Sequence, residues 1–323
     1  MPRPVADLQR LCNDILVRHG LSDEDAHIVT DILIEAELRG HNTHGLLRLS
    51  GIVQRIQNSK RRPMKLARDG GAYALIDGQD NLGYLVAHRC ARTVIGKGDQ
   101  TGIGIVGGFN TSHSGMLGYY TTMIADAGLI GLAMCDTSPR MVAWGGTEAI
   151  LGSNPVSAAF PAGKGQIVVD LSCAAITNGQ LHLAMKDGSP IPDGCALDLD
   201  GRLTTDASQA REGAALPFGG HKGYARSLMI QILSGALVRA SVIPERGSNY
   251  GMLMIAISPS IFLDPRFFQT GVEELIERIK STRKAEGVAE ILIPGERSFR
   301  LREAQLRDGI EIEKDLLGEL EEL

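Results

Sequence analysis

The chain has 323 residues, of which 43% are apolar and 22% charged, and its net charge is −5. This composition is typical of a soluble globular protein with a sizeable core, in one large domain or two ordinary ones. The negative balance argues against nucleic acid or an anionic membrane as a partner, because both attract basic proteins.

The cysteines and the start of the chain exclude further classes of protein. The five cysteines are widely spaced and contain no Cys-x-x-Cys pair, so we expect neither a metal site nor a disulfide framework. The N-terminus lacks the apolar run of a signal peptide, and no apolar run is long enough for a membrane span. We therefore expect a cytoplasmic protein.

The first half of the chain begins with helices and then alternates strands with helices. Apolar spacing predicts a helix over 4–20, and a capping sequence at Ser22 predicts a second that ends near Arg39. Helical periodicity continues to about Ser59, with a break at 42–45. We then expect strands at 72–78, 103–108 and 129–135 and helices at 85–95 and 117–127. This alternation predicts an α/β layer arrangement.

The second half of the chain contains more turns. Residues 144–161 are rich in Gly, Asn and Pro, and 188–205 form a polar loop. We expect strands at 167–172, 250–257 and 291–293, the last leading into a turn at 294–296. We expect helices from about 221 to 237 and over 272–283, and a charged helical tail over 300–323 that packs on the N-terminal helices.

The stretch Arg39–Arg48 carries a candidate reaction centre. It places Thr43, His44 and Arg48 within ten residues, and a helix that restarts after Gly45 would put Arg48 one turn from His44. A histidine exchanges protons near neutral pH, and an arginine grips a carboxylate through two hydrogen bonds. The pair suits a reaction at a carbon next to a carboxylate. The alternative is two ordinary residues at a helix break.

Two further features point to a bound ligand. The run Gly219-Gly-His-Lys-Gly precedes a helix, whose first N–H groups bind phosphate, and Lys222 adds a positive charge. It lacks the spacing of a P-loop and of the Rossmann Gly-x-Gly-x-x-Gly fingerprint. His113 lies in a loop after a buried strand, where ligands gather in α/β folds. The alternatives are a plain glycine-rich turn and a solvated histidine.

Taken together, five motifs resemble the malate/L-lactate dehydrogenase family of NAD(P)-dependent oxidoreductases, which also contains imine reductases acting on Δ1-pyrroline-2-carboxylate and Δ1-piperideine-2-carboxylate. The motifs occur in the family's order at 39–48, 110–120, 144–161, 216–224 and 293–296. The resemblance implies a mixed-sheet α/β fold that is not Rossmann, with helical N- and C-terminal segments packed together. It also implies a homodimer whose active site lies near the dimer interface.

The resemblance implies a role for each region and each motif. Residues 1–104, with 270–323 packed back on them, would form the substrate and dimerisation region, and 105–269 the cofactor-binding region. His44 would donate and accept the proton, Thr43 would orient it, and His113 would be a second acid/base. Arg48 and Ser153 would bind the small carboxylate substrate. The expected contacts with NAD or NADP are Ser114, Gly115, Met116, Leu117, Gly118, Asp170, Leu171, Ser172, His221, Lys222, Pro294, Gly295 and Glu296.

The implied activity is hydride transfer between a nicotinamide and C2 of a small 2-oxo or 2-hydroxy acid. Three departures from the family bear on this prediction: Ser114 replaces a usual Phe, Cys173 a usual Thr or Ser, and Gln180 the Asp of the imine reductases. Gln180 cannot supply the negative charge of that Asp, which weakens the imine-reductase alternative. A non-catalytic dinucleotide-binding protein is the third possibility. Arg297 is a candidate contact for the 2′-phosphate of NADP.

Overall fold

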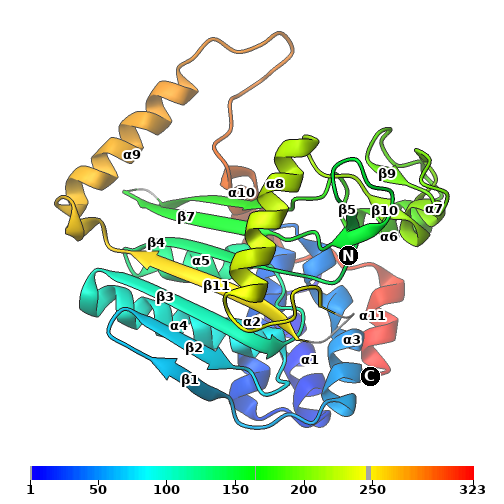
Figure 1. Cartoon of the computed structure of the whole chain (residues 1–323), viewed down its shortest axis with the longest axis horizontal. Coiled ribbons are helices and arrows are strands. Elements are labelled where there is room, and N and C mark those ends of the chain that lie inside the picture. Colours follow the sequence, from blue (N-terminus) through cyan, green and yellow to red (C-terminus); the bar gives the residue numbers. More distant parts are fainter. Residues whose placement is uncertain (1, 164, 245–248) are drawn as a thin grey trace.

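The computed structural model describes residues 2–163, 165–244 and 249–323, and a seven-stranded mixed sheet lies at its centre (Figure 1). The strand order is β1-β2-β3-β11-β4-β7-β8, and all neighbours are antiparallel except β2 and β3. The strands are β1 (Lys65–Asp69), β2 (Tyr73–Asp77), β3 (Ile103–Thr111), β4 (Ile130–Cys135), β7 (Val156–Ala162), β8 (Gly165–Leu171) and β11 (Tyr250–Ile257). The predicted mixed-sheet α/β fold is confirmed.

Helices cover both faces of this sheet. The crossover helix α4 (Gly83–Thr101) returns the chain so that β2 and β3 run parallel. It shares one face with α5 (Leu117–Asp126), while α8 (His221–Gln231) crosses the other face. Glycines in β3 show the two sides: a Cβ at Gly108 would meet the Cys90 sulfur of α4, and one at Gly107 would meet Val238, which follows α8.

Helices from both ends of the chain pack together on the side of the sheet that α4 and α5 cover. These are α1 (Val5–Arg18), α2 (Asp23–Leu38), α3 (Leu49–Asn58), α10 (Glu296–Asp308) and α11 (Lys314–Glu321). Backbone hydrogen bonds join Arg3 with Ile310, and Nε2 of His19 lies 2.8 Å from the carbonyl oxygen of Leu323. The predicted packing of the tail on the N-terminal helices is confirmed. Apolar side chains of α1, α2, α3, α4, α5 and α11, together with residues of the large sheet, form the larger core.

A smaller unit lies beside the main sheet. It contains a four-stranded sheet in the order β6-β5-β10-β9 and the helices α6 and α7. Its elements are β5 (Met141–Val142), β6 (Ala149–Leu151), α6 (Asn178–Asp187), β9 (Ala196–Leu197), α7 (Ala207–Glu212) and β10 (Ala214–Ala215). Several of these elements pack around a second apolar core that includes Met141, Leu181 and Ile230.

Some predictions about individual elements are wrong. Residues 291–293 form no strand: one hydrogen bond, from the N–H of Val168 to the carbonyl oxygen of Pro294, joins the segment to β8. The segment turns at Gly295, whose φ is +90°, directly into α10. The sequence also yielded no prediction of the strands β1 and β7, of the short strands β5, β6, β9 and β10, or of the helices α6 and α7. The helix expected at 272–283 is α9 (Pro265–Lys280), because Asp264 caps it and Pro265 occupies its first turn.

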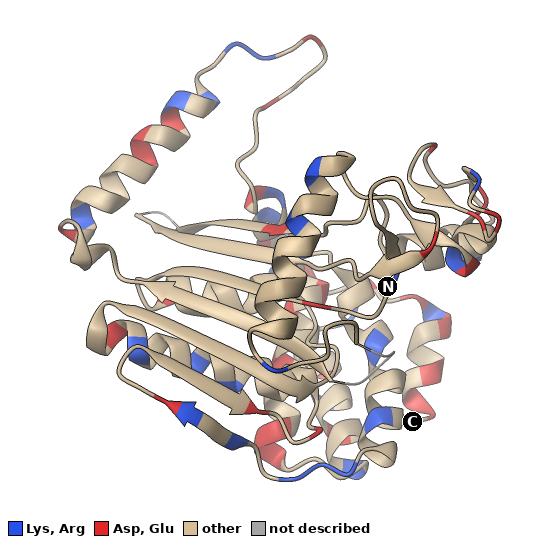
Figure 2. Ribbon diagram, in the orientation of Figure 1, with Lys and Arg blue, Asp and Glu red and all other residues tan. Residues whose placement is uncertain are grey.

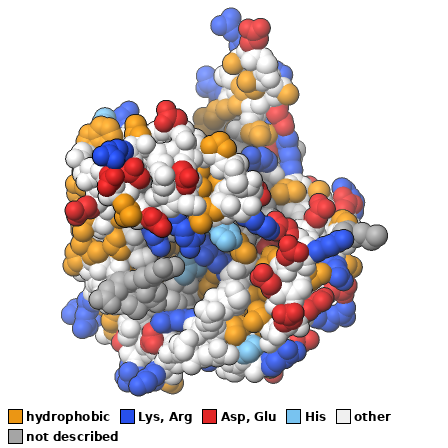
Figure 3. Space-filling model, turned by 90° about the vertical axis from the view of Figure 1, so that its right-hand side faces the viewer, with side chains coloured by type: hydrophobic (Ala, Val, Ile, Leu, Met, Phe, Trp, Pro, Cys, Tyr) orange, Lys and Arg blue, Asp and Glu red, His pale blue; other side chains and the backbone are white. Residues whose placement is uncertain are grey.

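The helix α9 and the loop after it project from the body of the molecule (Figures 1 and 3). None of the residues of α9 is buried, although Phe267, Leu275 and Ile279 are apolar. Charged residues of both signs lie mainly on helices and loops, and most of the large sheet is uncharged (Figure 2). Within the described part of the chain, no helix combines the length and the apolar character needed to cross a membrane.

The expected division at residues 104 and 105 runs through β3, so the two expected regions share the large sheet. The assignment of substrate binding and dimerisation to one region and of cofactor binding to the other therefore stays a prediction.

Candidate active site

The stretch after α2 forms a compact loop, here called the histidine loop, over residues 39–48. It consists of two 3-10 turns, Asn42–His44 and Leu46–Arg48, before α3 begins at Leu49. The buried Glu37 fixes this path, because its Oε1 accepts the N–H of Leu46 at 2.7 Å. A Cβ at Gly45 would lie 2.2 Å from the same oxygen, so a larger residue here would displace the buried Glu37 side chain.

The histidine loop brings the predicted reacting residues together. Thr43 Oγ1 lies 3.1 Å from Nδ1 of His44, and Nε of Arg48 donates to the carbonyl oxygen of Thr43 at 2.6 Å. The ring of His113 stacks on that of His44, with 5.8 Å between centroids and 27° between planes. A 3-10 turn, in place of the expected helix restart, therefore holds Arg48 near His44.

The surroundings of His113 define its tautomer. Its Nδ1 accepts the N–H of Gly115 at 3.2 Å and lies 3.3 Å from the hydroxyl of Tyr84. Because a neutral ring carries one proton, that proton then lies on Nε2. The geometry makes His113 a hydrogen-bond donor through Nε2 in its neutral form.

Burial and one nearby cation keep both histidines neutral. Burial first, and then the positive charge of Arg48, lower the pKa of His44 to about 4. The same two causes, in the same order, lower the pKa of His113 well below its usual value. The guanidinium of Arg48 is thus a cation close to both rings, suited to an anionic substrate group.

The start of α6 supports the histidine loop from the other side. A Cβ at Gly179 would lie 2.3 Å from Cγ2 of Thr43, so the helix start touches the Thr43 side chain. The side chain of Gln180 turns away to cap α6: its Oε1 accepts the N–H and the hydroxyl of Thr177, each at 3.0 Å. Gln180 is therefore a helix cap in this structure.

The predicted cofactor residues on β8 and α5 meet at one point. The N–H of Gly118 donates to Oδ2 of Asp170 at 2.7 Å, and a Cβ at Gly118 would lie 2.9 Å from that oxygen. Burial raises the pKa of Asp170 to about 6, against the opposing effect of this hydrogen bond. Beside them, Ser114, Met116 and Leu117 are buried, whereas Leu171 is 46% exposed.

Ser172 and Ser153 lie next to each other beyond the end of β8. The carbonyl oxygen of Ser153 accepts the N–H of Cys173 at 2.8 Å and the hydroxyl of Ser172 at 3.3 Å. The Cys173 thiol is buried and donates to the carbonyl oxygen of Asn154 at 3.0 Å, so it is a packed structural group. Arg226 of α8 donates to the carbonyl oxygen of Ser172 at 2.7 Å, which ties α8 to this strand end.

The start of α8 has the features of a phosphate site. Gly219 and Gly220 have positive φ angles of 67° and 65°, and no side chain caps the helix. His221 and Lys222 are exposed there, and the ring of Trp144 lies edge-on to that of His221 at 6.3 Å between centroids. Free N–H groups at a helix start with a lysine beside them suit the phosphates of a dinucleotide.

The third predicted cofactor segment lines a large cavity. Pro294 and Glu296 face a space of about 890 Å³ between α5, β8, α9 and α10. Lys280 and Arg300 each form an ion pair with Glu296. The hydrogen bond from Lys280, and to a smaller extent that from Arg300, lower the pKa of Glu296 to about 2. Gly295 turns tightly against Val168, two residues before Asp170.

The structure thus brings Thr43, His44, Arg48 and His113 into one cluster. Asp170 and Gly118 form a second group. Among the described contacts, none joins His221 or Lys222 to the histidine cluster. No three His, Cys, Asp or Glu side chains within 2–163, 165–244 and 249–323 are arranged to hold a metal.

Sequence reasoning missed Glu37, Tyr84 and Arg39. The first two shape the histidine loop and the His113 ring. Glu37 lies in the last turn of α2 and Arg39 is the first residue of the loop. The available signal was therefore an acidic and a basic residue at the end of an apolar helix.

Comparison with known proteins shows similarity over nearly the whole chain. Residues 4–321 match the malate/L-lactate dehydrogenase family. The chain is 37% identical to the L-sulfolactate dehydrogenase of Methanocaldococcus jannaschii over 98% of its own length and 94% of that protein. It is 30% identical to the Δ1-pyrroline-2-carboxylate reductase of Pseudomonas fluorescens, over 96% of this chain and 95% of that one.

A solved structure extends the agreement to the fold. The malate dehydrogenase of Pyrococcus horikoshii superposes with a TM-score of 0.90 at 34% identity, over 100% of this chain and 94% of that one. The match in sequence covers nearly the whole chain, and the match in structure covers all of it. The chain belongs to the malate/L-lactate dehydrogenase family.

Proposed function

We propose that this protein is an NAD(P)-dependent oxidoreductase that transfers a hydride between the nicotinamide and C2 of a small 2-oxo or 2-hydroxy acid. The observation that carries the proposal is the cluster of Thr43, His44, His113 and Arg48, in which two neutral imidazoles lie beside one cation. Relatives across the chain's length are named as dehydrogenases and reductases, which supports an enzymatic role.

Each residue of the cluster has a separate task. Arg48 binds the substrate carboxylate and so fixes C2 relative to the rings. The bound carboxylate also offsets the charge of Arg48, which raises the pKa of His44 and readies it to carry a proton. His44 then donates that proton to the substrate oxygen on reduction and removes it on oxidation, while Thr43 holds the ring at Nδ1.

His113 acts as the second member of the cluster. Its Nε2–H is free to donate to the substrate oxygen, because Nδ1 is occupied by Gly115. A hydrogen-bond donor aimed at an oxygen that becomes negative stabilises the transition state. His113 thus positions and polarises the carbonyl, and the proton itself passes through His44.

NAD or NADP fits the second part of the site. We assign the phosphates to the start of α8 with His221 and Lys222, and further contacts to 114–118, 170–172 and 294–296. A dinucleotide bound there would supply or accept the hydride. Gly118 supports this assignment, since a Cβ at that position would fill the space beside the Asp170 carboxylate.

The cap formed by Gln180 bears on the choice of substrate. Imine reductases of the family tend to carry an Asp at this place, whereas Gln180 here is engaged with Thr177 and brings no charge to His44. Relatives named as L-sulfolactate and malate dehydrogenases make open-chain hydroxy acids the first candidates. Cyclic imines are the alternative, supported by the relative that reduces one by name.

We further propose a homodimer in the cytoplasm. The projecting helix α9 leaves Phe267, Leu275 and Ile279 uncovered, and a second copy of the chain is the partner that this family would provide. Five free, buried cysteines suit a reducing compartment. Light scattering on the protein and on Leu275→Glu/Ile279→Glu tests this part: a dimer that the variant converts to monomer supports it, and a monomeric parent protein contradicts it.

The activity is tested by following NADH and NADPH oxidation at 340 nm with a panel of 2-oxo acids and the two cyclic imino acids. Turnover of an open 2-oxo acid is the expected result. Turnover of cyclic imines alone would contradict the substrate class. Cofactor binding without turnover of any compound would favour a binding protein.

A further inference from the structure

Arg39 is a buried arginine that lies outside the reacting cluster. It closes α2 at the start of the histidine loop and is only 6% exposed. A buried guanidinium needs compensating contacts. Its Nε donates to Glu35 Oε1 at 2.6 Å, its Nη1 donates to Thr122 Oγ1 at 3.0 Å, and its Cζ lies 4.7 Å from the ring centroid of Phe299. The charge is therefore held in one place between α2, α5 and α10.

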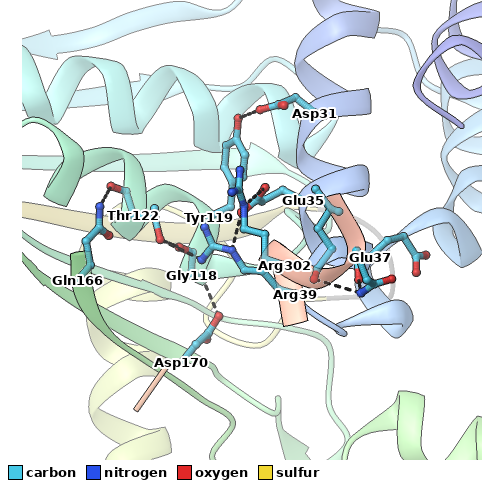
Figure 4. A network of polar contacts seen from close by, with 12 residues as sticks. Asp31, Glu35, Glu37, Arg39, Gly118, Tyr119, Thr122, Gln166, Asp170 and Arg302 are labelled. Atoms are coloured by element: carbon cyan, nitrogen blue, oxygen red, sulfur yellow. Dashed lines mark hydrogen bonds and ion pairs between the residues drawn. The ribbon is translucent and has the colours of Figure 1, made fainter. Parts of the chain in front are cut away.

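A continuous line of hydrogen bonds runs from Arg39 to Asp170, as Figure 4 shows. Thr122, which accepts from Arg39, donates to the carbonyl oxygen of Gly118 at 2.6 Å. The N–H of the same Gly118 donates to Oδ2 of Asp170 at 2.7 Å. Because Gly118 lies in the first turn of α5, the helix start also favours a negative charge at Asp170.

The charges around Asp170 come from few groups. Burial raises its pKa to about 6, and the Gly118 N–H and the charge of Arg39 oppose that rise. The Cys135 thiol of β4 also interacts with the charge of Asp170, and burial raises the pKa of this thiol, so it stays neutral. Glu35, the partner of Arg39, also accepts from Nε of Arg302, at 2.8 Å through Oε1 and 2.9 Å through Oε2. The group of Glu35, Arg39 and Arg302 therefore carries a net positive charge.

We propose that Arg39 is a positioning residue: through its charge and through Thr122 and Gly118 it keeps the Asp170 carboxylate ionised and in place to bind the dinucleotide. The inference rests on the proposed function, in which Asp170 contacts the cofactor. An ionised carboxylate accepts hydrogen bonds from ligand hydroxyl groups, and protonation removes part of that capacity. The loop that carries His44 and the strand end that binds the cofactor would thus be coupled through one arginine.

The first test uses the protein without cofactor. A carboxyl group whose pKa is higher in the folded than in the unfolded state reduces stability as pH rises between the two values. We therefore expect urea midpoints, at fixed protein concentration, to fall between about pH 4 and 6 relative to Asp170→Asn. The same comparison is then made between Arg39→Met and Arg39→Met/Asp170→Asn. Here the fall of the urea midpoint should extend to higher pH, because the loss of a cation that interacts with Asp170 raises the pKa of Asp170.

Arg302→Met is the matched control, since it also removes a cation from Glu35 but leaves Arg39 beside Asp170. The pH range over which its urea midpoint falls should equal that of the parent protein. If Arg39→Met and the parent lose stability over the same range, or if Arg302→Met shifts as far as Arg39→Met, the proposal is wrong. Should Arg39→Met fail to fold, Arg39→Lys supplies the test: it keeps the charge, so it should keep the parent's range.

The second test measures NADH and NADPH binding by fluorescence from pH 5 to 8. The parent's affinity should fall as pH drops through about 6. In Arg39→Met the midpoint should move to higher pH with a severalfold loss at pH 7, while Arg302→Met keeps the midpoint. An unchanged midpoint in Arg39→Met contradicts the proposal. If the parent binds neither cofactor at any pH, the proposed function fails, and the cofactor-free test still decides the role of Arg39.

Discussion

The two ends of the candidate site are built in opposite ways. At the histidine end, His44 and His113 are largely shielded from solvent, and Thr43, Tyr84 and backbone groups hold their rings. At the phosphate end, His221 and Lys222 are exposed at a helix start that two left-handed glycines make accessible. Proton transfer requires a fixed ring with a shifted pKa, whereas phosphate binding requires N–H groups and charge that a large ligand can reach.

This contrast predicts that changes at the histidine end lower turnover and that changes at the phosphate end weaken cofactor binding. The largest effect should come from His44→Ala. Loss of the proton donor should lower kcat by about 10²–10⁴-fold. Cofactor affinity, measured by fluorescence titration, should stay within about twofold because the ring lies away from α8. Lost cofactor binding with unchanged kcat would reverse the two roles.

Arg48→Gln should raise KM for the acid substrate by about 10²–10³-fold, since it removes one partner of a charge pair in a largely buried site. It should also shift the pH profile. Burial first, and then the charge of Arg48, hold the pKa of His44 at about 4. At saturating cofactor, kcat/KM for hydroxy-acid oxidation should be level above pH 5 and fall near pH 4. In Arg48→Gln, which lacks this cation, the fall of kcat/KM should occur at higher pH. A fall at an unchanged pH would exclude the titration of His44 as its cause.

Gly179→Ala sharpens the contrast without touching a reacting group. The added methyl would meet Thr43 and displace the side chain that holds His44. A misplacement of about 1 Å can lower kcat by about 10²-fold. Gly188→Ala, at the open end of the same helix, is the control, because nothing lies within 4 Å of a Cβ there, although its φ of +64° adds strain. Equal kcat values in the two variants would contradict the role of this contact.

Lys222→Ala tests the phosphate end. Loss of one exposed charged contact should weaken binding of NADH and NADPH about tenfold, with kcat at saturating cofactor nearly unchanged. Because the contact is exposed, the difference from the parent should shrink at high salt. Isothermal titration at two salt concentrations measures both effects. An Lys222→Ala protein with normal affinity would remove this residue from the cofactor site.

Arg297→Ala should have the smallest effect. Arg297 is exposed in the first turn of α10, next to Pro294–Glu296. If it contacts the 2′-phosphate, NADPH affinity should fall about threefold while NADH affinity is constant, as befits an exposed ion pair. Equal affinities for NADPH in the variant and the parent would exclude this contact.

The sequence predicted local features well and distant contacts poorly. The helix cap at Ser22, the strand at 250–257 and the loop of His44 depend on short patterns, and the structure contains each of them. The stacking of His113 on His44 and the contact of Gly179 with Thr43 join residues far apart in the chain, so no spacing rule reveals them. Residues 291–293 were apolar enough for a strand, but Pro294 and the turn at Gly295 lead the chain into a helix instead.

The central claim is that a hydride passes directly between the cofactor and C2 of a small acid. The most direct measurement uses NADH or NADPH carrying deuterium at both C4 positions with the best 2-oxo acid of the panel, followed by mass spectrometry and NMR of the product. The account predicts one deuterium at C2 of the hydroxy acid, and a rate of its appearance that His44→Ala lowers about 10²–10⁴-fold. A product without deuterium at C2, or an unchanged rate in His44→Ala, would contradict it.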